Sequence, residues 1–415
     1  MKNNALYFFS LLCSLTTTYG WYFYSPLRDH VLLPSFDDPI KKSFFIIGAG
    51  STSHAHAHTH NGTSDNPFFL WNSSESTIPM LQGFDGASKI GQLAQTINAH
   101  DDGTRGHIVL YGKYQITYGL LYGMFMPIAH GWSFLCMMPQ YHAKLSNIYM
   151  QDLTQQQTAE DSRVKQFLTN PLPSILDMYG SGLSINDWHK TGVGDLTCYM
   201  QWKCYFPQQK PMLKNVLLNA RVGIELPTAQ HISTNNMLSH SFGNEGAWAL
   251  PVGGQLKLYL GNYFAVGLDA EFTYILNQKV TRRVKTVKEQ TELLLLYKTK
   301  THIDFGMNQR FELFAQICME KYGLNTTLAY QYFKHGDDTL TPCSLAVDAQ
   351  IINNAQSLYE ITAHHVILNT EWNIAKSLNS NWRVNPTMSI FAKIPFNGKN
   401  GLLNTFIGSS LAINF

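Results

Sequence analysis

Long segments in which apolar and polar residues alternate constrain the fold of this chain more than any other feature. In the clearest of them, 195–206, the even-numbered positions are apolar and the odd-numbered positions are polar or amphipathic. A period of two predicts a β-strand with one apolar and one polar face. Soluble proteins use strands of about five or six residues, whereas a strand tilted across a bilayer needs about nine to eleven. Because these segments have about ten residues or more, they predict strands that cross a membrane.

The links between these segments alternate in length. The segments are 44–58, 107–127, 132–143, 194–206, 214–227, 247–260, 263–280, 302–319, 323–335, 358–376, 382–396 and 402–415. Short links of turn residues, such as 128–131 and 261–262, alternate with long polar links, of which 59–106 and 144–193 are the longest. An outer-membrane barrel has this arrangement, since its periplasmic turns are short and its extracellular loops are long. We therefore predict an all-β fold, a transmembrane, antiparallel, up-and-down β-barrel over 44–415. It would have about twelve strands, or about fourteen if the two longest links contain further hairpins.

The N-terminus has the order of a secretory signal peptide. Met1-Lys2 precede an apolar run that ends before the small residue Gly20. This run is shorter than the roughly 18 residues that a spanning helix needs, so it predicts a signal peptide over 1–20 and not a membrane anchor. We expect the mature chain to begin near Trp21, with 21–43 as a periplasmic segment before the barrel. These features predict export to the outer membrane, with outer-membrane lipid and the barrel-assembly machinery as partners.

The composition agrees with a surface that lipid partly covers. Only 14% of the residues are charged while 13% are aromatic, which is low charge and high aromatic content for a water-soluble surface of this size. The net charge of +2 gives no bias that would indicate a nucleic-acid partner. Aromatic rings beside the short links would form the periplasmic girdle of a barrel. These rings belong to Trp132, Tyr205, Phe206, Tyr259, Tyr263, Phe264, Tyr322 and Trp382.

Five cysteines remain outside the predicted signal peptide. Their odd number and irregular spacing, with no C-x-x-C pair, indicate neither a disulfide framework nor a zinc site. Cys198 and Cys204 would share one face of a strand but lie about 20 Å apart, too far to bridge each other. The other three are Cys136, Cys318 and Cys343. No cofactor is expected.

Two stretches of the chain and its C-terminus resemble known proteins. The stretches are GVGDLTCYMQWKCYF at 192–206 and NARVGIELPTAQ at 219–230, and the chain ends in AINF. They resemble the outer-membrane barrels of the phenol-degradation meta-pathway transporter family, in which a Gly-Asp-Leu strand start precedes a hairpin whose return strand ends in a Gly-x-x-Leu-Pro-Thr type sequence. The resemblance implies porin-like outer-membrane transport without identifying a solute. Phe415, at the end of an alternating strand, resembles the signal that the barrel-assembly machinery reads.

Charged residues on the predicted inner faces form the candidate pore lining. The residues expected to line the pore are Lys113, Lys203, Arg221, Glu225, Lys257, Asp269, Glu271, Arg310, Glu312, Glu371, Arg383 and Lys393. With Asp195 and Asp304 they comprise seven bases and seven acids, so we expect weak selectivity for the sign of an ion. Alternatively, these charges pair across the lumen and close it, which would make the protein a structural barrel.

A histidine tract is the most conspicuous local motif. The sequence STSHAHAHTHNG at 51–62 places His54, His56, His58 and His60 at alternate positions. On a strand they would point to one side, about 6.8 Å apart, so that neighbouring pairs could in principle hold a zinc, nickel or copper ion. A polar stripe that faces the lumen or forms a loop tip explains the same pattern without a metal.

The long link 144–193 contains a helical pattern, AEDSRVKQFL, which the proline of Asn170-Pro171 ends. This helix would either constrict the barrel mouth or lie outside it as a lid. We find no nucleophile elbow, H-E-x-x-H motif, P-loop or dinucleotide fingerprint, so we do not expect an enzyme.

The predicted function is a porin-like channel for passive diffusion of small solutes. The alternatives are a non-conducting structural or adhesion barrel that acts through its outer loops, and a barrel enzyme that acts on lipid or peptide. The oligomeric state is left open.

Overall fold

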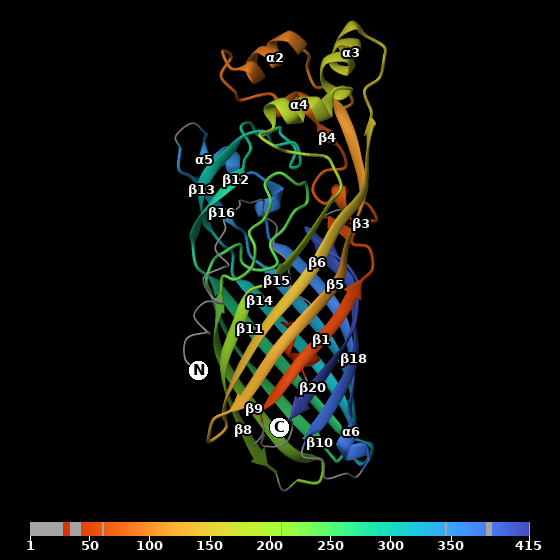
Figure 1. Cartoon of the computed structure of the whole chain (residues 1–415), viewed down its shortest axis with the longest axis vertical. Coiled ribbons are helices and arrows are strands. Elements are labelled where there is room, and N and C mark those ends of the chain that lie inside the picture. Colours follow the sequence, from red (N-terminus) through yellow and green to blue (C-terminus); the bar gives the residue numbers. More distant parts are fainter. Residues whose placement is uncertain are drawn as a thin grey trace, which may run out of the picture.

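The computed structural model describes residues 28–33, 43–59, 62–208, 210–344, 347–378 and 384–414. Its main feature is a tall β-barrel whose strands run obliquely around one lumen (Figure 1). Helices and small sheets, which we call the cap, lie over one end of the barrel. Among the described residues, no helix is long and apolar enough to cross a membrane.

Twelve strands close the barrel. They are β1 (Phe44–Thr52), β5 (His107–Pro127), β6 (Trp132–Asp152), β8 (Leu196–Pro207), β9 (Leu213–Leu226), β10 (Ala249–Leu260), β11 (Phe264–Ile275), β14 (Asn308–Met319), β15 (Leu324–His335), β17 (Ile361–Asn373), β18 (Asn385–Lys399) and β20 (Phe406–Asn414). All neighbours pair antiparallel, and β1 closes the barrel by pairing with both β5 and β20. The sheet also includes β4 (Glu75–Ser76) and β7 (Trp188–Val193), which are too short to cross a membrane. The prediction of an up-and-down barrel of about twelve strands is confirmed.

The barrel turns apolar side chains outward and charged side chains inward. Val222, Leu313 and Ile390 are 53%, 56% and 67% exposed. Their immediate neighbours on the same strands, Arg221, Glu312 and Ser389, are buried. A water-soluble protein shows the reverse preference. The outer wall is therefore of the lipid-facing kind, which confirms the predicted transmembrane barrel.

Short connections join the strands at the end opposite the cap. His130 and Gly131, with φ of 52° and 85°, form the tight turn between β5 and β6. The other turns at this end include the 3-10 turn η5 (Glu320–Tyr322) and the short helix α6 (Ile374–Ser377). This separation of short from long connections agrees with the predicted alternation of turns and loops.

The long connections build the cap. Its strands form two three-stranded sheets, one of β2 (His56–Thr59), β3 (Gly62–Ser64) and β19 (Gly401–Leu403), the other of β12 (Gln278–Arg283), β13 (Lys298–Asp304) and β16 (Thr339–Pro342). Its helices and single turns are η3 (Pro67–Phe69), α1 (Thr77–Met80), α2 (Lys89–Ile97), α3 (Ala159–Val164), the π-helical η4 (Lys165–Thr169), α4 (Leu172–Tyr179), α5 (Ala349–Ile352) and η6 (Gln356–Leu358). The predicted strand 44–58 is too long, because β1 ends at Thr52 and the following residues enter a cap sheet.

The predicted helix in the long link is confirmed. It begins at a capping box, in which the side chain of Thr158 and that of Asp161 each accept a hydrogen bond from the other residue's backbone N–H. Pro171 separates α4 from the preceding helical turns. α3 and α4 lie at the top of the cap beside α2 and not within the strands of the barrel (Figure 1). Their place at the top of the cap favours the lid over the constriction of the barrel mouth.

One disulfide corrects the expectation drawn from the cysteines. Cys136 on β6 and Cys198 on β8 form a disulfide, with their Cα atoms 4.3 Å apart. The two residues lie directly opposite each other in the strand register. Their separation of 62 residues carries no signal of this pairing, because strand register and not sequence spacing brings them together. Among the described residues, Cys204 and Cys343 are not part of a disulfide.

Candidate functional site in the barrel lumen

Most of the predicted pore-lining residues lie in the barrel interior. These are Lys203, Arg221, Glu225, Lys257, Asp269, Glu271, Arg310, Glu312, Glu371 and Lys393, all buried except Lys203, which is half-buried beside Phe125. Alternation on strands β8 to β18 places them there, because the apolar residues between them face outward. The contacts between these residues bear on whether they line an open path or fill the lumen.

Three predicted residues lie elsewhere or outside the described chain. Lys113 is exposed, while its neighbour Tyr114 is buried in the interior. The β5–β6 register shifts between Ile116 and Tyr118, and this bulge on β5 reverses the alternation, so that Tyr114 and not Lys113 shares the inner face with Leu121 and Phe125. Asp304 belongs to β13 in the cap, and Arg383 is outside the described residues.

Arg221 is the centre of the charged network in the lumen. Its Nη1 and Nη2 donate to the two carboxylate oxygens of Asp269 at 2.7 and 2.6 Å, and its Nε donates to Glu271 at 2.9 Å. Tyr199 donates its hydroxyl to the same Glu271 carboxylate at 3.1 Å. The guanidinium thus holds two acids from β11 in a bidentate and a single contact, geometry that only arginine provides.

Arg310 on β14 joins this centre to a third acid. Its guanidinium nitrogens lie 3.3 Å from Glu271 and 3.4 Å from Glu312. Gln331 on β15 donates to Glu312 at 2.7 Å. Charges from β9, β11 and β14, with the Gln331 amide from β15, therefore meet across one side of the lumen.

Residues 28–33 enter the lumen and bind this network. Arg28 pairs with Glu225, and Asp29 accepts a hydrogen bond from Lys393 at 2.6 Å. Asp29 also lies 3.6 Å from Arg310. Within residues 28–33, the 3-10 turn η2 (His30–Leu32) follows Asp29.

Further contacts hold η2 in place. His30 Nε2 lies 3.4 Å from Glu271, and Asn369 donates its side-chain amide to the carbonyl of Val31 at 3.2 Å. Leu32 is buried in the main apolar cluster of the barrel. We call residues 28–33 the lumen segment.

The lumen segment corrects the placement of part of the N-terminal region. The prediction put 21–43 in the periplasm, but 28–33 lie inside the barrel. The sequence around the three consecutive ionisable residues Arg28, Asp29 and His30 shows no local pattern that predicts a position inside the barrel. Their partners are up to 364 residues away in the sequence, so only the closed barrel brings them together.

The lumen also has an apolar wall that the alternation did not predict. Phe44 and Ile46 on β1 face inward together with Phe125 on β5 and Leu135 on β6. They line a pocket of about 780 Å³, a volume that includes open solvent. Charged residues of the barrel also line it, namely Lys203, Lys257, Asp269 and Glu371, and so do His30, Val31 and Leu33 of the lumen segment. The pocket therefore combines an apolar surface on β1, β5 and β6 with charged and apolar residues from the other strands. On β5 and β6 both faces are largely apolar, so alternation alone does not show which face points into the barrel.

The histidine tract lies in the cap and not on a barrel strand. His54 is exposed, His56 Nδ1 lies 2.8 Å from Asp65, and His58 is buried. His60 is outside the described residues. Among the residues that the structure describes, no three potential ligands gather to hold a metal ion. Metal binding by the tract stays a prediction.

Other predicted features are outside the described residues. These are the signal peptide 1–20, the mature start at Trp21 and the C-terminal Phe415. They stay predictions as well.

Comparison with known proteins identifies the type of fold. No protein-family model matches the chain, and no curated protein matches it. Among solved structures, the COG4313 outer membrane channel from Pseudomonas putida F1 is similar over 92% of this chain and 100% of that one, with 10% identity and a TM-score of 0.50. The Pseudomonas putida toluene transporter TodX aligns over 90% of this chain and 89% of its own, with 7% identity and a TM-score of 0.32, too low to support an argument. The chain shares the β-barrel fold of the COG4313 protein.

Proposed function

We propose that this protein is an outer-membrane channel for the passive diffusion of small solutes, closed at rest by the lumen segment. The observation that carries the proposal is the ion-paired segment 28–33 inside a lumen lined by charged side chains. Export by the predicted signal peptide and insertion by the barrel-assembly machinery belong to the same proposal.

The contacts of the lumen segment suit a plug that can leave. Most of them are ion pairs and hydrogen bonds to Glu225, Lys393, Glu271 and Asn369. Water replaces such contacts at a modest net cost, because each contributes about 0.5–3 kcal/mol after exchange with solvent. The strands around the segment pair continuously with their neighbours, so its departure need not disturb the barrel wall.

The apolar and charged residues that line the lumen indicate which solutes the channel would favour. Phe44, Ile46, Phe125 and Leu135 form an apolar surface in the same pocket as the charged residues. A solute with one apolar side would lose less hydration on this path than a bare ion. We therefore propose small solutes with an apolar face as the preferred cargo.

A non-conducting structural barrel is the second candidate. The pairing of Arg221 and Arg310 with three acids favours it, because paired charges fill the lumen even without the lumen segment. The two candidates differ in what happens when the segment is released.

The replacement of Arg28, Asp29 and His30 by alanine tests the proposal. In proteoliposome swelling with L-arabinose, we expect the triple variant to swell at least about tenfold faster than the wild type. The loss of one charge-assisted hydrogen bond of about 1.5–3 kcal/mol already shifts a closed-to-open ratio by that factor. Lys214→Ala, at an exposed position of β9, is the matched control and should swell like the wild type. If the folded triple variant is as impermeable as the wild type, the structural barrel is the better account.

A further inference from the structure

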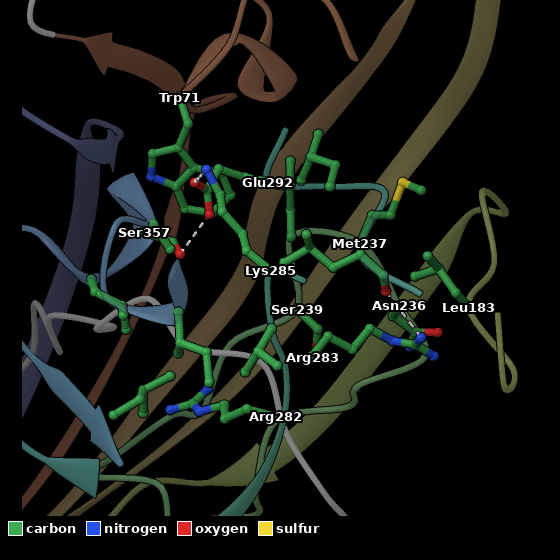
Figure 2. Close-up of a pocket in the computed structure, with 18 residues that line it drawn as sticks. Trp71, Leu183, Asn236, Met237, Ser239, Arg282, Arg283, Lys285, Glu292 and Ser357 are labelled. Carbon is green, nitrogen blue, oxygen red and sulfur yellow. Dashed lines mark hydrogen bonds and ion pairs between the residues drawn. The ribbon is translucent and has the colours of Figure 1, made fainter. Parts of the chain in front are cut away.

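A second pocket lies in the cap, and none of the residues that line it belongs to the lumen segment. It is a space of about 650 Å³, which includes open solvent at its mouth. Five of the long connections contribute to it, through Trp71, Leu183, Met237, Leu293 and Leu358 among others. Figure 2 shows these connections converging on one space.

The pocket combines an apolar lining with an excess of positive charge. Most of the side chains around it are apolar, and its charged residues are Arg282, Arg283, Lys285 and Glu292. All four are buried. Buried charges are expected to have partners, because an unpaired charge is costly to remove from water. The partners of each charge therefore indicate what the pocket lacks.

Two of the cations have protein partners. Lys285 lies 3.0 Å from Glu292, whose other carboxylate oxygen accepts a hydrogen bond from Ser357 at 2.9 Å. Arg283 donates to the backbone carbonyls of Thr234 and Leu295 at 2.7 and 3.1 Å. Burial lowers the pKa of Arg283 to about 10, so it remains a cation at neutral pH.

Arg282 differs from these two. Its Nη2 pairs with Glu245, but its Nε and Nη1 are buried with no hydrogen-bond acceptor among the described residues. The residue is only 3% exposed and lines the pocket. Buried donors without an acceptor are rare in folded proteins, and they often mark the place of a ligand or ion. The missing group is an acceptor, and the excess of cations makes it an anion.

We propose that the cap pocket binds an amphipathic organic carboxylate. Its carboxylate would accept hydrogen bonds from Arg282, and its hydrocarbon or aryl body would occupy the apolar part of the pocket beside Leu293, Ala355 and Leu358. Charge-assisted hydrogen bonds to a guanidinium suit a carboxylate, and the apolar lining selects against small inorganic anions. A role in loading the channel rests on the proposed function, whereas binding itself does not.

Calorimetry on the full chain in lipid nanodiscs tests this site, with 4-phenylbutyrate as the probe and 4-phenyl-1-butanol as its neutral analogue. Empty nanodiscs measure partition into lipid. We expect saturable binding of the carboxylate at one site and binding of the alcohol that is at least about tenfold weaker, because the alcohol lacks the charge-assisted hydrogen bonds.

Three variants locate the site. Arg282→Gln should weaken 4-phenylbutyrate binding at least about tenfold. Ala355→Trp, which fills the apolar part without touching a charge, should abolish it. Lys300→Gln removes an exposed cation of the same cap and should bind like the wild type. Heat-modifiable gel mobility checks that each variant is folded.

Several outcomes would overturn the inference. They are no saturable binding by the wild type, equal binding of the alcohol, or unchanged binding by folded Arg282→Gln or Ala355→Trp. If Arg282→Gln fails to fold, the alcohol and Ala355→Trp still decide. None of these results depends on conductance, so the channel proposal can fail or hold separately.

Discussion

Replacing Arg221 by alanine is expected to lower the free energy of unfolding by about 3–5 kcal/mol. The substitution leaves Asp269 and Glu271 buried without the guanidinium that lies 2.6 and 2.9 Å from them. An uncompensated buried carboxylate is costlier than the ion pair that it replaces. Urea unfolding of the protein in lipid vesicles, followed by tryptophan fluorescence, measures this difference.

Lys334→Ala is the matched control for this substitution. Lys334 also pairs with an acid, Glu360, at 2.6 Å, but the two side chains are 30% and 32% exposed. Exposed ion pairs contribute about 0–1 kcal/mol, so this variant should unfold close to the wild type. Equal effects of the two substitutions would show that the lumen network does not stabilise the barrel.

The disulfide between β6 and β8 gives the second large effect. Replacement of both Cys136 and Cys198 by serine should lower the free energy of unfolding by about 4 kcal/mol, the value that chain entropy gives for a loop of this length. The loop spans 62 residues and includes helices α3 and α4, so its closure restricts the unfolded chain strongly. The measurement is again urea unfolding in vesicles.

Two controls define the disulfide result. The wild type treated with a reductant should unfold like the double variant, and Cys204→Ser, which removes a free cysteine, should leave the unfolding midpoint unchanged. An unfolding midpoint that does not respond to reduction would mean that the two thiols do not restrain the chain.

The barrel was predictable because its strands invert the usual distribution of side chains. Alternation marks β9, β11 and β14 clearly, since every second residue faces lipid and the residues between them face a charged interior. The bounds of β5 coincide with the predicted 107–127, because the residues around Gly131 form an unmistakable turn. Local sequence therefore determines which residues form strands and where the chain turns.

The parts that were missed depend on contacts between distant segments. The lumen segment binds Lys393 and Glu225, 364 and 197 residues away, and nothing in the sequence near Asp29 indicates either partner. The disulfide depends on the register of β6 against β8. The apolar lumen wall around Phe125 was missed because both faces of β5 are apolar there. In each case the closed barrel, and not a local pattern, creates the contact.

Single-channel conductance of a reversibly tethered lumen segment tests the central claim most directly. Asp29→Cys and Lys393→Cys would be joined by a short, reducible bis-methanethiosulfonate linker, in a background with serine at positions 204, 318 and 343. The wild type treated with the same reductant controls for loss of the native disulfide. We predict that the tethered protein is silent in planar bilayers and that reduction produces discrete channel openings. Equal conductance before and after reduction, in a folded barrel, would contradict the claim that residues 28–33 close the channel.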